Sequence, residues 1–247
     1  MDSRGTLHQH DDLTLELEGV ELVMRRNQRD EQQDAALLEA GLVAVADGMG
    51  GHDRGRDASR AALAALAAAC RVPCDADELE RAAFEADTAV RALPFDGWRA
   101  PGTTLVAAAA TAAGDRLVGV WCGDSRAYLV HGDGTLERLT SDHCGPLGGL
   151  DAALGGHGDV GAHFDHFEVE VGHGHRLLLA TDGLTGPFDI AEVRGQLPDG
   201  TAVGDADEAL AAVLRQGLAQ AADAAERFGS DNVTVVTVDV DTFAAAR

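Results

Sequence analysis

The stretch GLVAVADGMGGHDRG, residues 41–55, carries one acid out of an apolar run and into a glycine-rich loop. Five apolar or small residues, 42–46, lead directly into Asp47 and Gly48. A carboxylate at the end of a buried strand costs stability unless its charge is satisfied. The pattern therefore predicts a strand whose terminal acid either caps the following helix or binds a metal ion.

The patterns around this stretch predict strands and helices in separate runs. Residues 34–48 are typical of a hairpin of two apolar strands with its turn near Gly41, and residues 13–24 alternate as one half-buried strand would. Residues 57–70, 77–93 and 207–228 have helical patterns, the last as one long amphipathic helix. Further strands are expected within 103–111, 116–124, 126–140, 166–172, 175–183 and 232–240. This order favours an α+β fold with antiparallel sheets. Without a repeat or a linker, we expect a single domain over 1–247.

Charge and composition exclude several classes of partner. The net charge is −23 and every basic residue is arginine, so the surface repels nucleic acid, anionic membranes and phosphate that is not accompanied by cations. No run approaches the roughly 20 apolar residues that span a bilayer, and the polar N-terminus resembles no signal peptide. We therefore expect a cytoplasmic location, with the four cysteines as free thiols. Cys70 and Cys74 lie one helical turn apart, which favours a buried helix face over a metal site.

Four apolar segments end at, or begin after, an acid beside glycine, serine or asparagine. These acids are Asp47, Asp124, Asp182 and Asp231. One such acid is more often a helix cap or a turn residue, but four can converge at one edge of a sandwich. Hard oxygen ligands suit Mg²⁺ or Mn²⁺. Glycine lets the backbone approach closely, so the Gly48 carbonyl is a further candidate ligand.

Six motifs follow one another along the chain: VADGMGGHDRG (45–55), GTTL (102–105), GDSRAYLV (123–130), LTSDH (139–143), LLLATDGL (177–184) and SDNVTVV (230–236). Taken in this order, they resemble the bacterial form of the protein phosphatase 2C family. The resemblance spans residues 20–240, with a motif-bearing core of about 13–241. It implies a sandwich of two antiparallel β-sheets flanked by α-helices, with a two-metal site at one end. It also implies metal-dependent hydrolysis of phosphoserine and phosphothreonine on proteins that Ser/Thr kinases have phosphorylated.

The same resemblance implies a role for each acid. Asp47 would bridge two Mn²⁺ or Mg²⁺ ions, and Asp182 and Asp231 would complete the first of them. The Gly48 carbonyl would bind the second ion. Asp124 would share a weaker third ion with Asp182.

The family also places an arginine five residues before an aspartate, ahead of the first motif strand. The sequence offers Arg25 with Asp30, or Arg29 with Asp34. We favour the second register because an apolar strand begins directly after Asp34. Arg29 would then bind the substrate phosphate as a planar fork, and Asp34 would hold a metal-bound water. The alternative is that Arg29 is a surface residue on an edge strand.

The implied nucleophile is a water that bridges the two metal ions. No protein nucleophile is expected, since Ser125 and Cys144 lie in turns without an obvious base. His52 is a possible proton donor to the leaving oxygen, although a metal-bound water is favoured. The histidine-rich segment 163–175 matches the spacing of no closed zinc site.

The segment 144–152 is where the chain departs from the family pattern. It stands where the family usually has a helical flap, and it is too short and glycine-rich for a pair of helices. We therefore expect a tight turn there and a third metal ion that is bound weakly or is absent.

Two other functions stay open: a catalytically weak, phosphatase-like regulatory or binding module, and a hydrolase that forms an aspartyl-phosphate. The second would need two acids two residues apart followed by threonine, which the DGMGG segment lacks. The expected state is a monomer.

Overall fold

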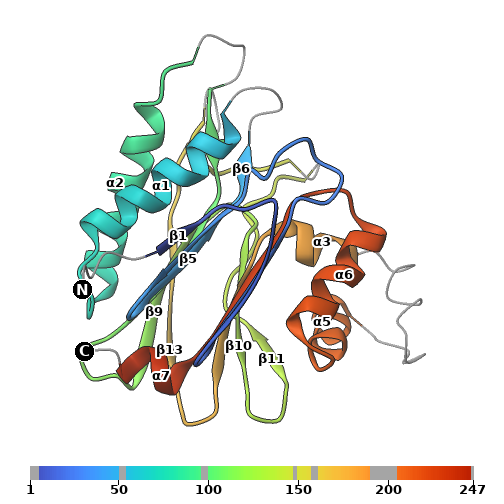
Figure 1. Cartoon of the computed structure of the whole chain (residues 1–247). Coiled ribbons are helices and arrows are strands. Elements are labelled where there is room, and N and C mark those ends of the chain that lie inside the picture. Colours follow the sequence, from blue (N-terminus) through green and yellow to red (C-terminus); the bar gives the residue numbers. More distant parts are fainter. Residues whose placement is uncertain are drawn as a thin grey trace.

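The computed structural model describes residues 6–49, 54–95, 100–146, 149–156, 161–189 and 205–245, and two six-stranded sheets dominate it (Figure 1). All strand pairs within each sheet are antiparallel. Across the first sheet the strands are β1 (Thr6–His8), β4 (Ala35–Glu39), β5 (Leu42–Ala46), β8 (Leu105–Ala110), β9 (Arg116–Cys122) and β13 (Asp165–Glu170). Across the second they are β11 (Leu136–Arg138), β10 (Arg126–Val130), β14 (Arg176–Ala180), β15 (Val233–Asp239), β3 (Val20–Arg25) and β2 (Asp12–Leu17).

Helices cover the outer face of each sheet, so the molecule has four layers (Figure 1). Helices α1 (Gly55–Ala69) and α2 (Ala76–Arg91) pack on the first sheet. Helices α3 (Asp182–Asp189), α5 (Ala206–Leu214) and α6 (Leu218–Phe228) pack on the second. The short α7 (Val240–Ala245) lies at the end of the sandwich opposite β6 (Gly48–Met49). Among the described helices, none combines the length and apolarity that a membrane span requires.

Strand β5 shows why the apolar run before Asp47 is continuous. Ala44 packs with the helices of the first sheet, whereas Val43 and Val45 pack between the two sheets. A strand that is covered on both faces has no solvent side and needs no alternating polar residues. The predicted α+β sandwich of antiparallel sheets is therefore confirmed, and so is the hairpin of β4 and β5, which turns at Gly41 with φ of 80°.

A third, smaller sheet carries the chain away from the end of β5. It contains β6, β7 (Gly102–Thr103) and β12 (Leu154–Gly155). A Cβ atom on Gly48 would lie 2.1 Å from the Gly55 carbonyl oxygen, at the start of α1. Glycine is required at Gly48 because β6 and α1 touch through their backbones.

Two expected elements are wrong because a glycine interrupts each of them. Residues 13–24 form the hairpin of β2 and β3, which turns at Gly19 with φ of 74°. Residues 207–228 form two helices, α5 and α6, separated at Gly217 with φ of 126°. A positive φ of this kind ends a strand or a helix, and glycine adopts it without steric cost. The single domain over 1–247 stays a prediction.

Candidate metal and phosphate site

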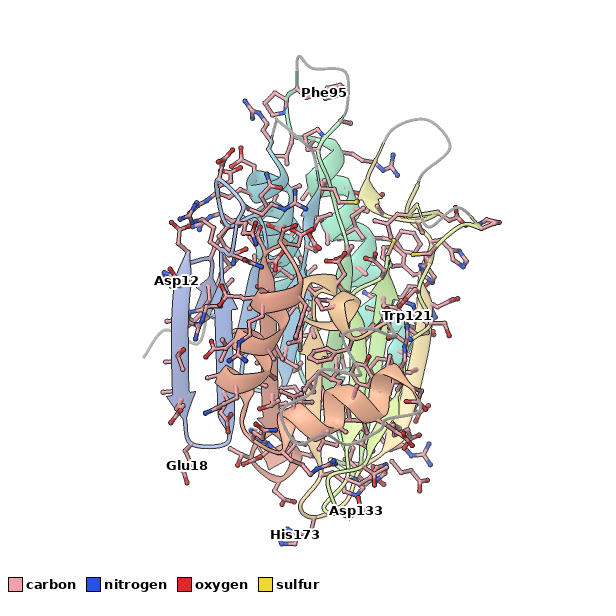
Figure 2. The ribbon with its side chains drawn as sticks, turned by 90° about the vertical axis from the view of Figure 1, so that its right-hand side faces the viewer. Asp12, Glu18, Phe95, Trp121, Asp133 and His173 are labelled. Carbon is pink, nitrogen blue, oxygen red and sulfur yellow. The ribbon has the colours of Figure 1, made fainter. Side chains whose placement is uncertain are left out.

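The predicted acids all lie at the β6 end of the sandwich. Figure 2 shows Glu18, Asp133 and His173 together at the opposite end, in the turns that join β2 to β3, β10 to β11 and β13 to β14. Strands β3 and β14 therefore run toward the β6 end, and β10 and β15 start there. The residues at these strand ends are Asp34 before β4, Asp47 after β5, Asp124 before β10, Asp182 after β14 and Asp231 before β15.

These carboxyls are close enough to alter one another's ionisation. Burial, and then the charges of the other four acids, raise the pKa of Asp47 well above its usual value. Burial and the charges of Asp182 and Asp231 raise the pKa of Asp34 to about 7, although a hydrogen bond from Thr181 opposes the shift. Burial and Asp182 likewise raise the pKa of Asp124 to about 7. Crowded, half-buried acids of this kind are typical of functional sites.

Two carboxylate oxygens in this cluster are buried without a hydrogen-bond partner. Thr181 Oγ1 donates to Asp34 Oδ2 at 2.9 Å, which leaves Asp34 Oδ1 unpaired. Asp182 Oδ1 is the other unpaired oxygen. Hard oxygen atoms without partners suit a divalent cation. In the part of the chain that the structure describes, no three His, Cys, Asp or Glu side chains converge as ready-made ligands.

Arg29 faces this cluster, whereas Arg25 does not. The Arg29 guanidinium donates a hydrogen bond to Asp231 and forms an ion pair with it. That bond, with the charges of Asp231, Asp47 and Asp182, raises the pKa of Arg29. Arg25 instead donates to the carbonyl oxygens of residues 13 and 24, both at 3.0 Å. This placement supports the register of Arg29 with Asp34, and the role of Arg29 stays a prediction.

Asn232 holds the loop that carries Arg29, and sequence reasoning missed it. Its Oδ1 accepts from the Gln33 N–H at 2.8 Å, and its Nδ2 donates to the carbonyls of Arg26 at 2.8 Å and Glu31 at 3.1 Å. One amide side chain therefore fixes the loop on both sides of Arg29. The available signal was its position in the SDN motif, directly after Asp231.

Two threonines fix the backbone of Asp47, and they too received no role from the sequence. The Asp47 N–H donates to Thr104 Oγ1 at 3.0 Å, and the Thr104 N–H donates to the Asp47 carbonyl at 2.9 Å. Thr103 Oγ1 donates to the same carbonyl at 2.8 Å. Ser125 Oγ lies 2.7 Å from Thr104 Oγ1, which links the turns of Asp47 and Asp124. The signal was the GTTL motif.

The LTSDH motif supports the Asp124 turn. The His143 N–H donates to the Gly123 carbonyl at 3.0 Å, and the Gly123 N–H donates to His143 Nδ1 at 3.2 Å. The indole ring of Trp121 stacks on the His143 imidazole. A Cβ atom on Gly123, where φ is 109°, would lie 2.7 Å from Thr104 Cγ2. The turn is thus positioned by packing and by backbone hydrogen bonds.

Three other sequence predictions concern the segment 144–152, His52 and the segment 163–175. The described residues of 144–152 contain no helix, and they form a turn in which the Gly145 N–H donates to the Gly149 carbonyl at 2.8 Å. His52 lies outside the described residues. In the segment 163–175, His163, His166 and His173 lie beside three different acids, Asp165, Glu80 and Asp241.

Comparison with known proteins gives the family. The family model described as protein phosphatase 2C matches residues 25–218. The chain belongs to the protein phosphatase 2C family. Its relatives include the serine/threonine protein phosphatase PstP of Mycobacterium tuberculosis, with 32% identity over 86% of this chain, which spans only 43% of PstP. The serine/threonine phosphatase stp of Listeria innocua is 30% identical over 80% of this chain and 84% of stp.

A solved protein phosphatase 2C structure has the same fold. The catalytic domain of the serine threonine protein phosphatase PstP, in complex with two manganese ions, is 29% identical, with a TM-score of 0.65. The match covers 95% of this chain and 99% of that one. The family resemblance carried by the six motifs is therefore confirmed.

Proposed function

We propose that this chain is a metal-dependent phosphatase that hydrolyses phosphoserine and phosphothreonine in proteins. The observation that carries the proposal is that five acids lie at one end of the sandwich and alter one another's ionisation, with Asp34 Oδ1 and Asp182 Oδ1 buried and unpaired. Arg29 lies beside them. The serine/threonine phosphatases named among the relatives support the same activity.

The chain's own oxygens fit two Mn²⁺ or Mg²⁺ ions. Asp47, Asp182 and Asp231 would supply carboxylate ligands, and the buried Gly48 would supply its carbonyl. The two manganese ions bound by the PstP catalytic domain support this stoichiometry. When bound, such ions supply positive charge that acidifies water and neutralises phosphate oxygens. Asp124 stands beside Asp182 and would hold a third ion, weakly if at all.

The protein side chains then bind and orient the reactants. Arg29 binds the phosphate with a planar pair of N–H donors. Asn232 keeps the Arg29 loop in place through its three backbone hydrogen bonds. Asp34, held at Oδ2 by Thr181, orients the attacking water with Oδ1. Water is the proposed proton donor to the leaving oxygen, with His52 as the alternative.

Phosphate release in Mn²⁺ and in EDTA tests this function. We expect hydrolysis of p-nitrophenyl phosphate and of a phosphothreonine peptide in Mn²⁺, and none in EDTA. Manganese binding measured by calorimetry without turnover would favour the alternative, a phosphatase-like binding module. A covalent, hydroxylamine-sensitive phosphoprotein would favour an aspartyl-phosphate mechanism. The monomeric state and the cytoplasmic location stay predictions.

A further inference from the structure

Two cysteines meet at the turn between α1 and α2, far from the acid cluster. Cys70 ends α1 as its C-cap, and its N–H donates to the Leu66 carbonyl at 2.8 Å. Cys74 lies just before Asp75, which caps α2. Their Sγ atoms are 3.7 Å apart. The other end of α1 lies against Gly48, and a helix of 15 residues is about 22 Å long.

The geometry of this pair suits a covalent bond. A disulfide joins sulfur atoms about 2.0 Å apart, so the two Sγ atoms need to approach by less than the radius of one sulfur atom. Rotation about the side-chain bonds supplies such a movement while the backbone stays anchored, at Cys70 by Leu66 and at Cys74 by an N–H bond of 3.3 Å to the Ala110 carbonyl. We propose that Cys70 and Cys74 form a reversible intramolecular disulfide when the chain meets a peroxide oxidant.

The hydrogen bond between the two sulfur atoms couples their ionisation. Either sulfur can donate this bond, and the sulfur that accepts it is favoured as the thiolate. The thiolate of the pair reacts first with the oxidant, and the neighbouring thiol then resolves the product.

The reaction balances with one peroxide. The thiolate of the pair attacks a peroxide oxygen, so an S–O bond forms, the O–O bond breaks and hydroxide leaves, which takes up the proton that this thiol had released. The second cysteine sulfur then attacks the sulfenic acid. The S–S bond forms, the S–O bond breaks and water leaves with the proton of the second thiol. Two thiols are oxidised, one peroxide is reduced to two waters, and a thiol reductant reverses the change.

The remaining cysteines provide internal controls. Cys122 is fully buried in β9, and burial raises its pKa to about 12. Cys144 is an exposed residue, and the pKa of its thiol is raised by partial desolvation and by the charges of nearby acids. Cys70 and Cys74 are 7% and 5% exposed, which admits a molecule as small as hydrogen peroxide. The bond would tie α1 to α2 and raise the melting temperature of the protein, because it restricts the unfolded chain.

Peptide mapping of the full-length chain tests the inference. After treatment with hydrogen peroxide, we expect a mass loss of two hydrogen atoms, a Cys70–Cys74 cross-linked peptide, and a melting temperature higher by a few degrees. Dithiothreitol should restore the starting mass. Cys144→Ser should behave like the unaltered chain. Cys70→Ser and Cys74→Ser should each abolish the cross-linked peptide, and dimedone should trap a sulfenic acid on the cysteine of the pair that remains.

Other outcomes would overturn the proposal. Free Cys70 and Cys74 after peroxide treatment, or a disulfide that includes Cys122 or Cys144, would do so on the unaltered chain, where no variant can complicate folding. Dimedone trapped on Cys144 alone in both variants would refute the reactivity of the Cys70–Cys74 pair. A disulfide that leaves the melting temperature unchanged would refute its stabilising effect.

Discussion

Two groups of aspartates in this molecule have sharply different surroundings. In the acid cluster, Asp47 is flanked by four other acids, and burial with their charges raises its pKa. In the neighbouring arginine–aspartate network, Asp142 accepts hydrogen bonds from Arg126 at 3.0 and 2.7 Å and from Arg138. Burial acts to raise the pKa of Asp142, but the arginines outweigh it and lower the pKa overall.

The difference teaches that residue type and burial alone do not distinguish a structural acid from a functional one. Asp142 stabilises the fold because two guanidinium groups from the chain neutralise it. The cluster around Asp47 keeps more negative charge than the chain neutralises, which costs stability. Such destabilising repulsion between acids is expected in a natural protein where a cation from outside the chain neutralises it. The five predictions below test this contrast.

The largest expected effect is loss of hydrolysis in Asp47→Asn. We expect the rate with Mn²⁺ to fall by about a thousandfold or more, since removing a bridging carboxylate weakens both metal binding and water activation. In EDTA the variant should melt no lower than the unaltered chain, because one of the crowded negative charges is gone. Phosphopeptide turnover and thermal melting measure the two effects. Full activity at saturating Mn²⁺ would show that the site is misassigned.

The addition of metal should raise the free energy of unfolding of the protein. Mn²⁺ at a hundred times its Kd adds about 2.7 kcal/mol to the free energy of unfolding, because it binds the folded state only. We expect the melting temperature in Mn²⁺ to exceed that in EDTA, with most of the rise lost in Asp231→Asn and retained in Asp142→Asn. Equal melting temperatures with and without Mn²⁺ in the unaltered chain would contradict a metal site.

Asp142→Asn should have the opposite effects to Asp47→Asn: a loss of stability with turnover nearly retained. We expect it to lower the free energy of unfolding by about 2 kcal/mol at neutral pH, since charged hydrogen bonds to Arg126 and Arg138 are lost, while turnover stays within about threefold. The pKa of Asp142 is lower in the folded state, so its stabilisation is present above the unfolded value of 3.8 and is lost as pH falls through the folded value.

Urea unfolding at neutral and at acidic pH measures this effect. The difference between the unaltered chain and Asp142→Asn should shrink as the solution is acidified. A difference that grows in acid would mean that Asp142 is not held by the arginines.

Arg29→Ala should affect phosphate rather than metal. We expect the KM for a phosphopeptide to rise by about tenfold, equivalent to about 1.4 kcal/mol, with Mn²⁺ affinity little changed. Arg25→Ala is the matched control, because Arg25 binds backbone carbonyls away from the cluster. Steady-state kinetics and calorimetry separate the two. If Arg25→Ala raised the KM and Arg29→Ala did not, the register of Arg29 with Asp34 would be wrong.

The smallest effect concerns a third ion at Asp124. The segment 144–152 is too short and glycine-rich for a pair of flap helices, so we expect little occupancy of this ion even in crystals soaked in concentrated Mn²⁺. Anomalous scattering measures the occupancy. A well-occupied ion bound by Asp124 and by backbone atoms of 144–152 would show that the short segment replaces a helical flap.

The sequence predicted those parts of the fold that depend on local pattern. Apolar runs marked the strands of both sheets, and Gly41 marked the hairpin of β4 and β5. The same kind of pattern failed at Gly19 and Gly217. Apolar residues stand at odd positions up to Leu17 and at even positions from Val20, and this change of phase marks the turn, whereas the amphipathic period continues across Gly217. Helix α3 was missed since its own residues, DGLTGPFD, favour turns.

The residue types of the candidate site could be predicted from the sequence, but the contacts that position these residues could not. The acids stand beside glycine, serine or asparagine, which the sequence displays directly. The residues that position them act through distant backbone groups: Thr104 bonds Asp47 from 57 positions away. A Cβ on Gly183 would lie 1.7 Å from the Asn232 carbonyl oxygen, so this glycine is needed for a contact that no local pattern reveals.

The Asn232 contact also sets when the site is completed during synthesis. Gln33 and Asn232 are 199 residues apart, and β3 pairs along its length with β15. At typical ribosomal rates, roughly 10 to 40 s separate the emergence of the two ends of this contact. Until Asn232 leaves the ribosome, the Arg29 loop lacks its anchor and β3 lacks one neighbour. The nascent chain therefore has no anchored Arg29 loop until synthesis has passed β15.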